Sequence, residues 1–184
     1  FLLSCDDEAL GKSLVQLFLL DSTHYALSVK STLYNFISSR THKGILALGE
    51  SLTGLNAKER KEFFEAFPDF SKRMTLRALA QLELELRQSA ELCKIIFELQ
   101  PEAESSADCM LVLAIFEEKQ AKPESALRYL EKIYSDFPKS QIAGSALYFA
   151  MRIAKKMKKS EESQRLFKIL ENSAPWSTWY QLLK

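Results

Sequence analysis

The chain has 184 residues, of which 47% are hydrophobic and 27% charged, and its formal net charge at pH 7 is +1. This composition is ordinary for a globular protein, and the near-zero charge argues against a general nucleic-acid binder, which needs an excess of Lys and Arg. No apolar run approaches the roughly 20 residues that span a bilayer.

The first five residues, FLLSC, resemble the end of a bacterial lipoprotein signal. Cys5 would then carry a lipid that anchors the protein to a membrane. The alternative is an ordinary helix start that contains a cysteine, because a signal core has roughly 7–15 apolar residues and few precede Ser4. Cys93 and Cys109 lie in apolar helical patterns, which predicts that both are buried.

The N-terminal third has an irregular helical pattern. It is interpreted either as two degenerate helix pairs or as a helical cap on the more regular part of the chain. Pro68 ends its last helix, because proline cannot continue a helix. The predicted helices cover 7–20, 22–40, 44–53 and 57–67.

Several predicted helices begin with capping residues. Asn56 precedes Glu59 by three positions, the spacing of a capping box, and Ser105 precedes Asp108 in the same way. Pro123 opens another helix, since proline is tolerated in a first turn.

The stretch LELEL, residues 82–86, alternates like a strand. We expect it to be helical instead, because its residues favour helices and Glu83 with Arg87 forms an i,i+4 pair.

Three segments in the second half share one pattern: a small residue, apolar residues four and seven positions later, and a closing proline. The prolines Pro101, Pro138 and Pro175 are 37 residues apart in both intervals. A spacing of i, i+4, i+7 marks one face of a helix, and the proline is its stop signal. The segments are 89–101, 126–138 and 163–175.

A second helix precedes each of these segments, so the repeated unit is a helix pair. Such a pair cannot bury its apolar face alone, whereas stacked pairs share a core. We therefore expect an all-α fold, an α-solenoid of antiparallel helix pairs in a single domain over 1–184. Its parts are irregular helices over 1–68, units 70–101, 107–138 and 144–175, and a capping helix over 176–184 in which Trp176, Trp179 and Tyr180 cover the last unit.

Units 107–138 and 144–175 resemble tetratricopeptide (TPR) repeats, in the order of small and apolar residues and in the closing proline. Residues 126–170 are most similar to the branch found in bacterial cell-envelope proteins, such as the TolA-binding protein and the lipoproteins of outer-membrane assembly. In that branch an aromatic-Pro-x-Ser turn leads into Ala-Leu-Tyr, as 137–140 and 146–148 do here. The family's Trp and Gly on the first helix are replaced by Leu147 and Met151.

The resemblance implies a peptide-binding concave groove lined by the first helices of the units. Tyr148, Arg152 and Lys155 are spaced i, i+4, i+7 and share a face, which would suit an acidic segment or a peptide carboxylate. We expect this face to pack on nothing within the chain. The alternative is a solvated helix end, where cations favour the helix dipole. The candidate binding residues are Tyr148, Arg152, Lys155, Lys156, Leu111 and Ile115.

Motifs that would indicate enzyme chemistry are missing from the sequence. The tripeptide GKS at 11–13 lacks the rest of a phosphate-binding loop, because Asp6 stands where the first glycine is required. His24 and His42 are the only histidines, and neither belongs to a zinc-binding pattern. We therefore expect no catalytic residue, no metal and no cofactor.

The sequence supports three hypotheses for the function. The first is a non-enzymatic scaffold that binds a protein or peptide partner, but no nucleic acid, in the periplasm or at the outer membrane of a bacterial cell envelope. The second is a helical interaction domain of a cytoplasmic secretion chaperone or regulator. The third is a helical enzyme. The partner and the oligomeric state are not indicated by the sequence.

The repeat register makes a testable prediction about Ala126. This small residue is expected where the two helices of its unit cross. Ala126→Arg should lower the free energy of unfolding by several kcal/mol, because the new side chain overpacks the crossing and places a charge inside. Thermal unfolding measures the effect, and unchanged stability would show that the register is wrong.

Overall fold

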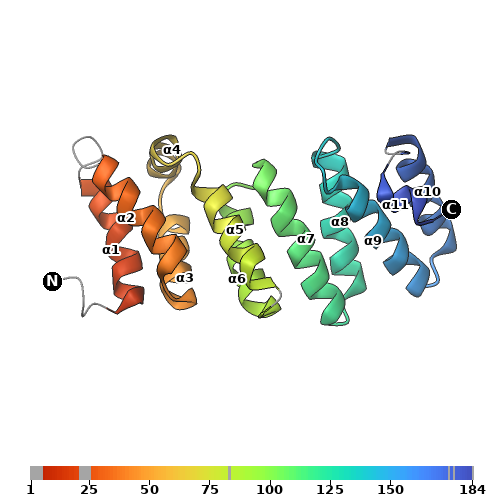
Figure 1. The fold of residues 1–184 in the computed structure, drawn as a ribbon, viewed down its shortest axis with the longest axis horizontal. Helices are drawn as coiled ribbons and strands as arrows, with labels where there is room; N and C mark the ends of the chain where they lie inside the picture. Colours follow the sequence, from red (N-terminus) through yellow and green to blue (C-terminus); the bar gives the residue numbers. More distant parts are fainter. Residues whose placement is uncertain (1–5, 21–25, 83, 174, 176, 184) are drawn as a thin grey trace. The chain divides into compact units, whose positions relative to one another are not determined.

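The computed structural model describes residues 6–20, 26–82, 84–173, 175 and 177–183. Helices make up most of the described residues, which contain no strand (Figure 1). The predicted all-α class is confirmed. Within those residues, no helix has both the length and the hydropathy needed to cross a membrane.

Contacts between Cα atoms divide the chain into two compact units, Phe1–Pro101 and Glu102–Lys184, and each is described by itself. The expectation of one continuous domain over 1–184 stays a prediction.

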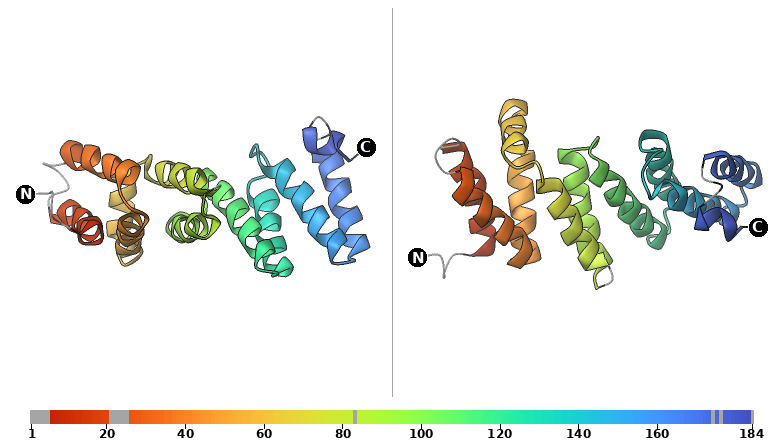
Figure 2. Two further views of the ribbon diagram at one scale, coloured as in Figure 1. Left: turned by 60° about the horizontal axis from the view of Figure 1, so that its bottom comes forward. Right: turned by 45° about the horizontal axis from the view of Figure 1, so that its top comes forward.

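In the first unit the helices form two layers. α1, α3 and α6 lie next to one another in one layer, and α2 packs against α1 and α5 (Figure 2). The closest partner of α3 is α1, not its sequence neighbour α4. α3 and α4, which would form the second of the two degenerate pairs, therefore do not pack together as a pair. The helices described here are α1 Asp7–Leu20, α2 Ala26–Ser39, α3 His42–Thr53, α4 Ala57–Ala66, α5 Phe70–Leu82 and α6 Leu86–Leu99.

Glycines determine how closely α1 and α3 approach. A Cβ atom added to Gly11 would lie 2.5 Å from the backbone oxygen of Gly44, and one added to Gly44 would lie 2.9 Å from the backbone oxygen of Asp7. Neither distance is sterically allowed, so only glycine fits at the crossing. The glycine of the rejected GKS motif thus has a packing role.

An aromatic cluster attaches α4 to the rest of the unit. The Phe63 ring lies 5.3 Å from Phe18 of α1 and 5.2 Å from Phe70 of α5, measured between ring centroids. All three side chains are buried. Edge-to-face pairs of this kind add to the stabilisation from burial.

The turn between α5 and α6 contradicts the expected helix over 82–86. α5 ends at Leu82 and α6 begins at Leu86, and Leu84, in the turn between them, is 87% exposed. The Ser89 hydroxyl donates to the Ala78 carbonyl at 2.7 Å and links the two helices. The chain reverses here because α5 and α6 bury their apolar faces on each other, and this tertiary gain outweighs local helix propensity.

The second unit contains two helix pairs followed by a short helix. α7 packs against α8, α9 packs against α10, and α8 also packs against α9. The four helices follow one another in this order in Figure 1. α11 packs on α9. The helices are α7 Glu104–Lys119, α8 Pro123–Asp136, α9 Ala143–Lys156, α10 Ser160–Ser173 and α11 Thr178–Gln181.

The two pairs have the same inner turn. Ala121 has φ 56° and Lys158 has φ 61°, and these two non-glycine residues in the left-handed region are 37 positions apart. In both turns the next residue donates a backbone hydrogen bond to the carbonyl five positions earlier, Lys122 to Glu117 and Lys159 to Ala154. This is the Schellman ending of a helix. The 37-residue repeat seen in the sequence is therefore also a repeat of backbone geometry.

Most of the expected helix boundaries are confirmed. α4, α6, α8 and α10 each end two residues before a proline. Asn56 and Glu59 form the predicted capping box, and Pro123 occupies the first turn of α8. The predicted cap at Ser105 is wrong, because α7 begins at Glu104 and places Ser105 inside the helix.

Predicted core residues of both units are buried. Ala126, Cys93 and Cys109 each have an exposed fraction of 0%. α8, which carries Ala126, packs against α7, as the repeat register requires.

The crossing of α1 and α3 gives a second prediction. Gly11→Ala should lower the free energy of unfolding by roughly 1–3 kcal/mol, because the added methyl group forces the two backbones apart. Urea unfolding followed by circular dichroism measures the difference.

Gly54→Ala is the matched control. Its added Cβ would lie 3.5 Å from the nearest atom, the backbone oxygen of Ser51, and the φ of Gly54 is −71°. Alanine is accommodated there, so stability should change by less than about 0.5 kcal/mol or rise. Equal losses at both glycines would contradict the close crossing.

Candidate functional site

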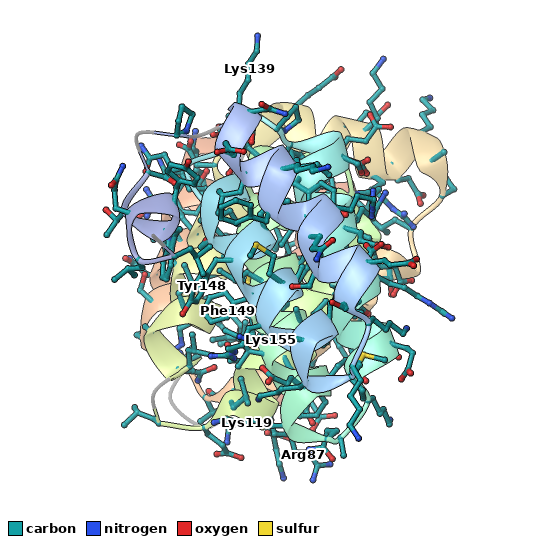
Figure 3. The ribbon with its side chains drawn as sticks, turned by 90° about the vertical axis from the view of Figure 1, so that its right-hand side faces the viewer. Arg87, Lys119, Lys139, Tyr148, Phe149 and Lys155 are labelled. Carbon is teal, nitrogen blue, oxygen red and sulfur yellow. The ribbon has the colours of Figure 1, made fainter. Side chains whose placement is uncertain are left out.

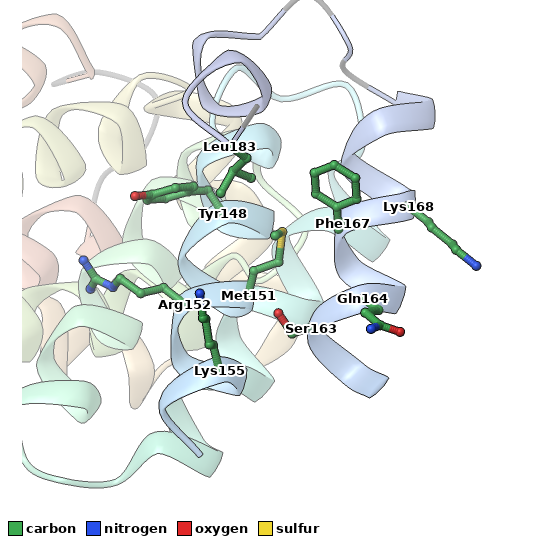
Figure 4. A pocket seen from close by; sticks show the side chains of 9 residues that line it. All are labelled: Tyr148, Met151, Arg152, Lys155, Ser163, Gln164, Phe167, Lys168 and Leu183. Carbon is green, nitrogen blue, oxygen red and sulfur yellow. The ribbon is translucent and has the colours of Figure 1, made fainter. Parts of the chain in front are cut away.

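A cavity of about 510 Å³ opens between α9 and α10 in the second unit (Figure 4). α9 contributes one wall, α10 the other, and the residues after α11 one end. Met151, Phe167 and Leu183 give it an apolar interior. The lining residues are Tyr148, Met151, Arg152, Lys155, Ser163, Gln164, Phe167, Lys168 and Leu183.

Three cations surround this apolar interior. Lys155 stands on the α9 side, the Arg152 guanidinium points away from α10, and the Lys168 ammonium points outward at the rim (Figure 4). Among the residues that the structure describes, Lys155 and Lys168 form no ion pair. An apolar trough beside uncompensated positive charge suits an amphipathic segment with acidic side chains.

Aromatic contacts hold α11 against α9 at one end of the cavity. The Trp179 ring lies 5.0 Å from Tyr148 and 5.8 Å from Phe149 between centroids. Tyr148, Phe149 and Lys155 follow one another along α9 in the end-on view of Figure 3. A Cβ added to Gly144 would lie 3.5 Å from Trp179, an ordinary contact, so the indole ring packs directly over this part of α9.

Tyr180 fixes α11 to α10. Its hydroxyl donates to Glu171 at 2.8 Å, and its ring lies 5.8 Å from Phe167. Tyr180 is buried, and Trp179 is partly buried, as expected for a capping helix. The predicted contribution of Trp176 lies outside the described residues.

An ion-pair network connects α7 to α9 beside the cavity. Glu118 accepts hydrogen bonds from Arg152 at 2.9 Å and from Lys156 at 2.7 Å. The Arg152 guanidinium also lies 4.9 Å from the Phe149 ring centroid, within cation–π range. Burial by itself would raise the pKa of the Glu118 carboxyl, but the hydrogen bond from Lys156 and the charge of Arg152 outweigh it and lower the pKa below 4.5.

The expectation that this face of α9 packs on nothing is therefore wrong. Tyr148 contacts Trp179, and Arg152 is paired with Glu118. Arg152 already stabilises the fold, so a partner would have to compete with Glu118 for it. Lys155 is the cation of this face that is available to a ligand.

The structure brings three of the predicted binding residues together at one cavity: Tyr148, Arg152 and Lys155. Lys156 is engaged by Glu118 and does not line the cavity. Leu111 and Ile115 lie half-buried on α7, and neither belongs to the lining. Cys5, the proposed lipidation site, lies outside the described residues.

Sequence reasoning missed the α10 wall of the cavity. It placed the site on first helices alone, whereas Ser163, Gln164 and Phe167 come from a second helix. A signal for them exists in the repeat: Ser163 and Phe167 occupy the positions of Ala126 and Leu130 one unit earlier. Those earlier residues are buried, while Ser163 and Phe167 are only partly covered.

No protein-family model matches this chain, and no curated protein is significantly similar to it. Among the residues that the structure describes, no group of three or more His, Cys, Asp and Glu side chains could hold a metal ion.

The lowered pKa of Glu118 gives a third prediction. A carboxylate whose pKa is lowered in the folded state stabilises the fold at any pH above its unfolded-state pKa. It loses that contribution as the pH falls through its folded-state pKa. At pH 7, Glu118→Gln should be less stable than the wild type by roughly 0.5–1 kcal/mol. The gap should shrink as the pH falls below 4.5, the ordinary pKa of a Glu carboxyl, because the wild-type carboxyl becomes protonated as the pH passes through its lowered folded-state pKa.

Glu98→Gln is the control, because Glu98 is exposed and forms no ion pair within the described residues. Its effect should be small at every pH. Chemical unfolding at pH 7 and pH 3 gives both differences. A Glu118→Gln gap that persists unchanged at pH 3 would show that the network does not act through the charge of Glu118.

Proposed function

We propose that the chain is a non-enzymatic interaction scaffold that binds a segment of a partner protein in the cavity between α9 and α10. The observation that carries the proposal is the combination of an apolar interior with Lys155, a cation that has no ion pair among the described residues. Met151 and Phe167 offer apolar contact area, and Lys155 offers an attachment point for a carboxylate.

We also propose that the helix pairs are TPR-like repeats of an α-solenoid. The proposal is supported by the proline stops of α6, α8 and α10 and by the equivalent turns at Ala121 and Lys158. Repeats of this kind expose extended binding surfaces while each pair contributes to a common core. The cavity belongs to the last of these pairs.

We place the scaffold in a bacterial cell envelope, on the similarity of residues 126–170 to the TPR proteins of that compartment. Anchoring through a lipid at Cys5 belongs to the same proposal. Expression of the intact protein with its native N-terminus, followed by mass spectrometry of Cys5, tests the lipid. An unmodified Cys5 would remove the anchor but leave the scaffold unaffected.

A binding selection tests the scaffold function. Random peptides selected on the intact chain should bind wild type and lose at least tenfold in affinity, or about 1.4 kcal/mol, to Lys155→Glu. The reversal replaces an attractive charge at the cavity with a repulsive one for acidic peptides. Fluorescence anisotropy measures the dissociation constants.

Lys159→Glu is the matched control. It changes the net charge by the same amount in the same unit, but Lys159 lies in the turn after α9 and outside the lining. Its effect should be less than about twofold, or 0.4 kcal/mol. Equal losses in the two variants would show that these lysines only form a solvated helix end. A failure to select any binder would contradict the scaffold proposal.

A further inference from the structure

The cavity has a counterpart one repeat earlier that is already occupied by a helix. When the sequence is shifted by one repeat of 37 residues, Lys155 aligns with Glu118 and Lys168 aligns with Glu131. Glu118 holds Arg152 and Lys156 of α9, and Glu131 lies 3.7 Å from Arg165 of α10. The surface formed by α7 and α8 thus receives the next helix pair through acidic residues, and the equivalent surface of α9 and α10 carries lysines.

The segment after α10 begins in the way that α9 begins. Pro175, Ser177 and Tyr180 occupy the positions of Pro138, Ser140 and Ala143. The Ser177 hydroxyl accepts from the backbone of Tyr180, and the Ser140 hydroxyl accepts from the backbone of Ile142. Tyr180 and Ala143 are both buried, with exposed fractions of 6% and 7%.

α11 therefore fills the place of the first turn of a following first helix. Leu183, which lines one end of the cavity, falls on Ala146, a fully buried residue of α9. In α9 the helix continues beyond Ala146 to Lys156. The cavity beside Met151, Lys155 and Phe167 lies along this stretch.

We propose that the cavity receives an amphipathic α-helix of a partner protein, seated as the next first helix of the repeat and carrying two acidic residues at i and i+4. This proposal rests on the proposed scaffold function and specifies its partner. The acidic pair takes the positions that Arg152 and Lys156 occupy toward Glu118, with the signs reversed, and binds Lys155. The apolar face of the helix has small residues at the positions of Ala150 and Ala154, because α9 approaches its neighbours closely through such residues.

Charge complementarity excludes the chain's own first helix as a model for the occupant. A helix with the sequence of α9 would bring Arg152 and Lys156 against Lys155, where like charges repel. The favoured occupant therefore differs from α9 in the sign of these two residues. This difference allows the seat and the charge to be tested separately.

The test uses labelled peptides with the sequence of residues 145–158 and the intact chain. The reversed-charge peptide carries Arg152→Glu and Lys156→Glu, and the parent peptide is unchanged. The reversed-charge peptide should bind wild type at least tenfold more tightly than the parent does. The order of affinities should invert with the Lys155→Glu chain, whereas Lys159→Glu should keep the wild-type order.

A third peptide adds Ala150→Pro to the reversed-charge sequence and breaks the helix in its centre. It should bind at least tenfold more weakly than the reversed-charge peptide without the proline. Equal binding of the two would overturn the helical seat but leave the scaffold proposal standing, because selected peptides need not be helical. Circular dichroism of each chain variant confirms that it is folded.

Other outcomes would overturn the inference. Equal binding of both charge forms, or no binding of either, would exclude an acidic helix as the occupant. Sedimentation of the chain without peptide tests a second copy: concentration-dependent dimers that Lys155→Glu abolishes would show that the occupant is another molecule of this chain and not a partner protein. A peptide selection that yields no binder would, in contrast, contradict the scaffold function itself.

Discussion

A helix pair buries the surface between its two helices, but its flanks need a neighbour. In the second unit, α7 and α8 have that neighbour, because α9 packs along α8 and reaches Glu118 of α7. α9 and α10 are covered on the equivalent flank only by α11, a helix of four residues, among the residues that the structure describes. The cavity, with its apolar interior and Lys155, lies on this incompletely covered flank.

The charges along this flank decide which neighbour fits. At the covered flank, Glu118 and Glu131 meet cations of α9 and α10, and at the open flank Lys155 and Lys168 replace them. Individual exposed ion pairs contribute little to affinity. The sign of the charges nevertheless discriminates strongly between partners, because like charges that an apolar contact holds together repel and cannot move apart. In the binding that we propose, the apolar trough supplies contact area and Lys155 supplies selectivity.

How much of the fold the sequence predicts depends on how local the signal is. Proline stops and the Asn56–Glu59 box act within one turn of helix, and the structure has them where expected. The turn at Leu84 and the contact between Gly11 and Gly44 depend on packing between segments distant in sequence. No periodicity in one helix can indicate either of them.

Only part of the candidate site can be predicted from the sequence, for the same reason. Tyr148, Arg152 and Lys155 share a face of one helix, so their spacing brings them together. Phe167 and Ser163 join them only because α10 folds back beside α9. Arg152 was assigned to ligand binding, but Glu118, 34 residues earlier, already engages it. An internal partner at that distance has no signature in local sequence.

We propose that a partner occupies the flank of α9 and α10, and not the face of α7 on which Leu111 and Ile115 lie. Methyl NMR measures this directly, with the Met151 methyl group reporting on the cavity and the Ile115 methyl groups on α7. Titration with an acidic helical peptide should shift the Met151 resonance and leave Ile115 unchanged. A shift at Ile115 with Met151 unchanged would contradict binding at the flank of α9 and α10 and would locate it on the face of α7.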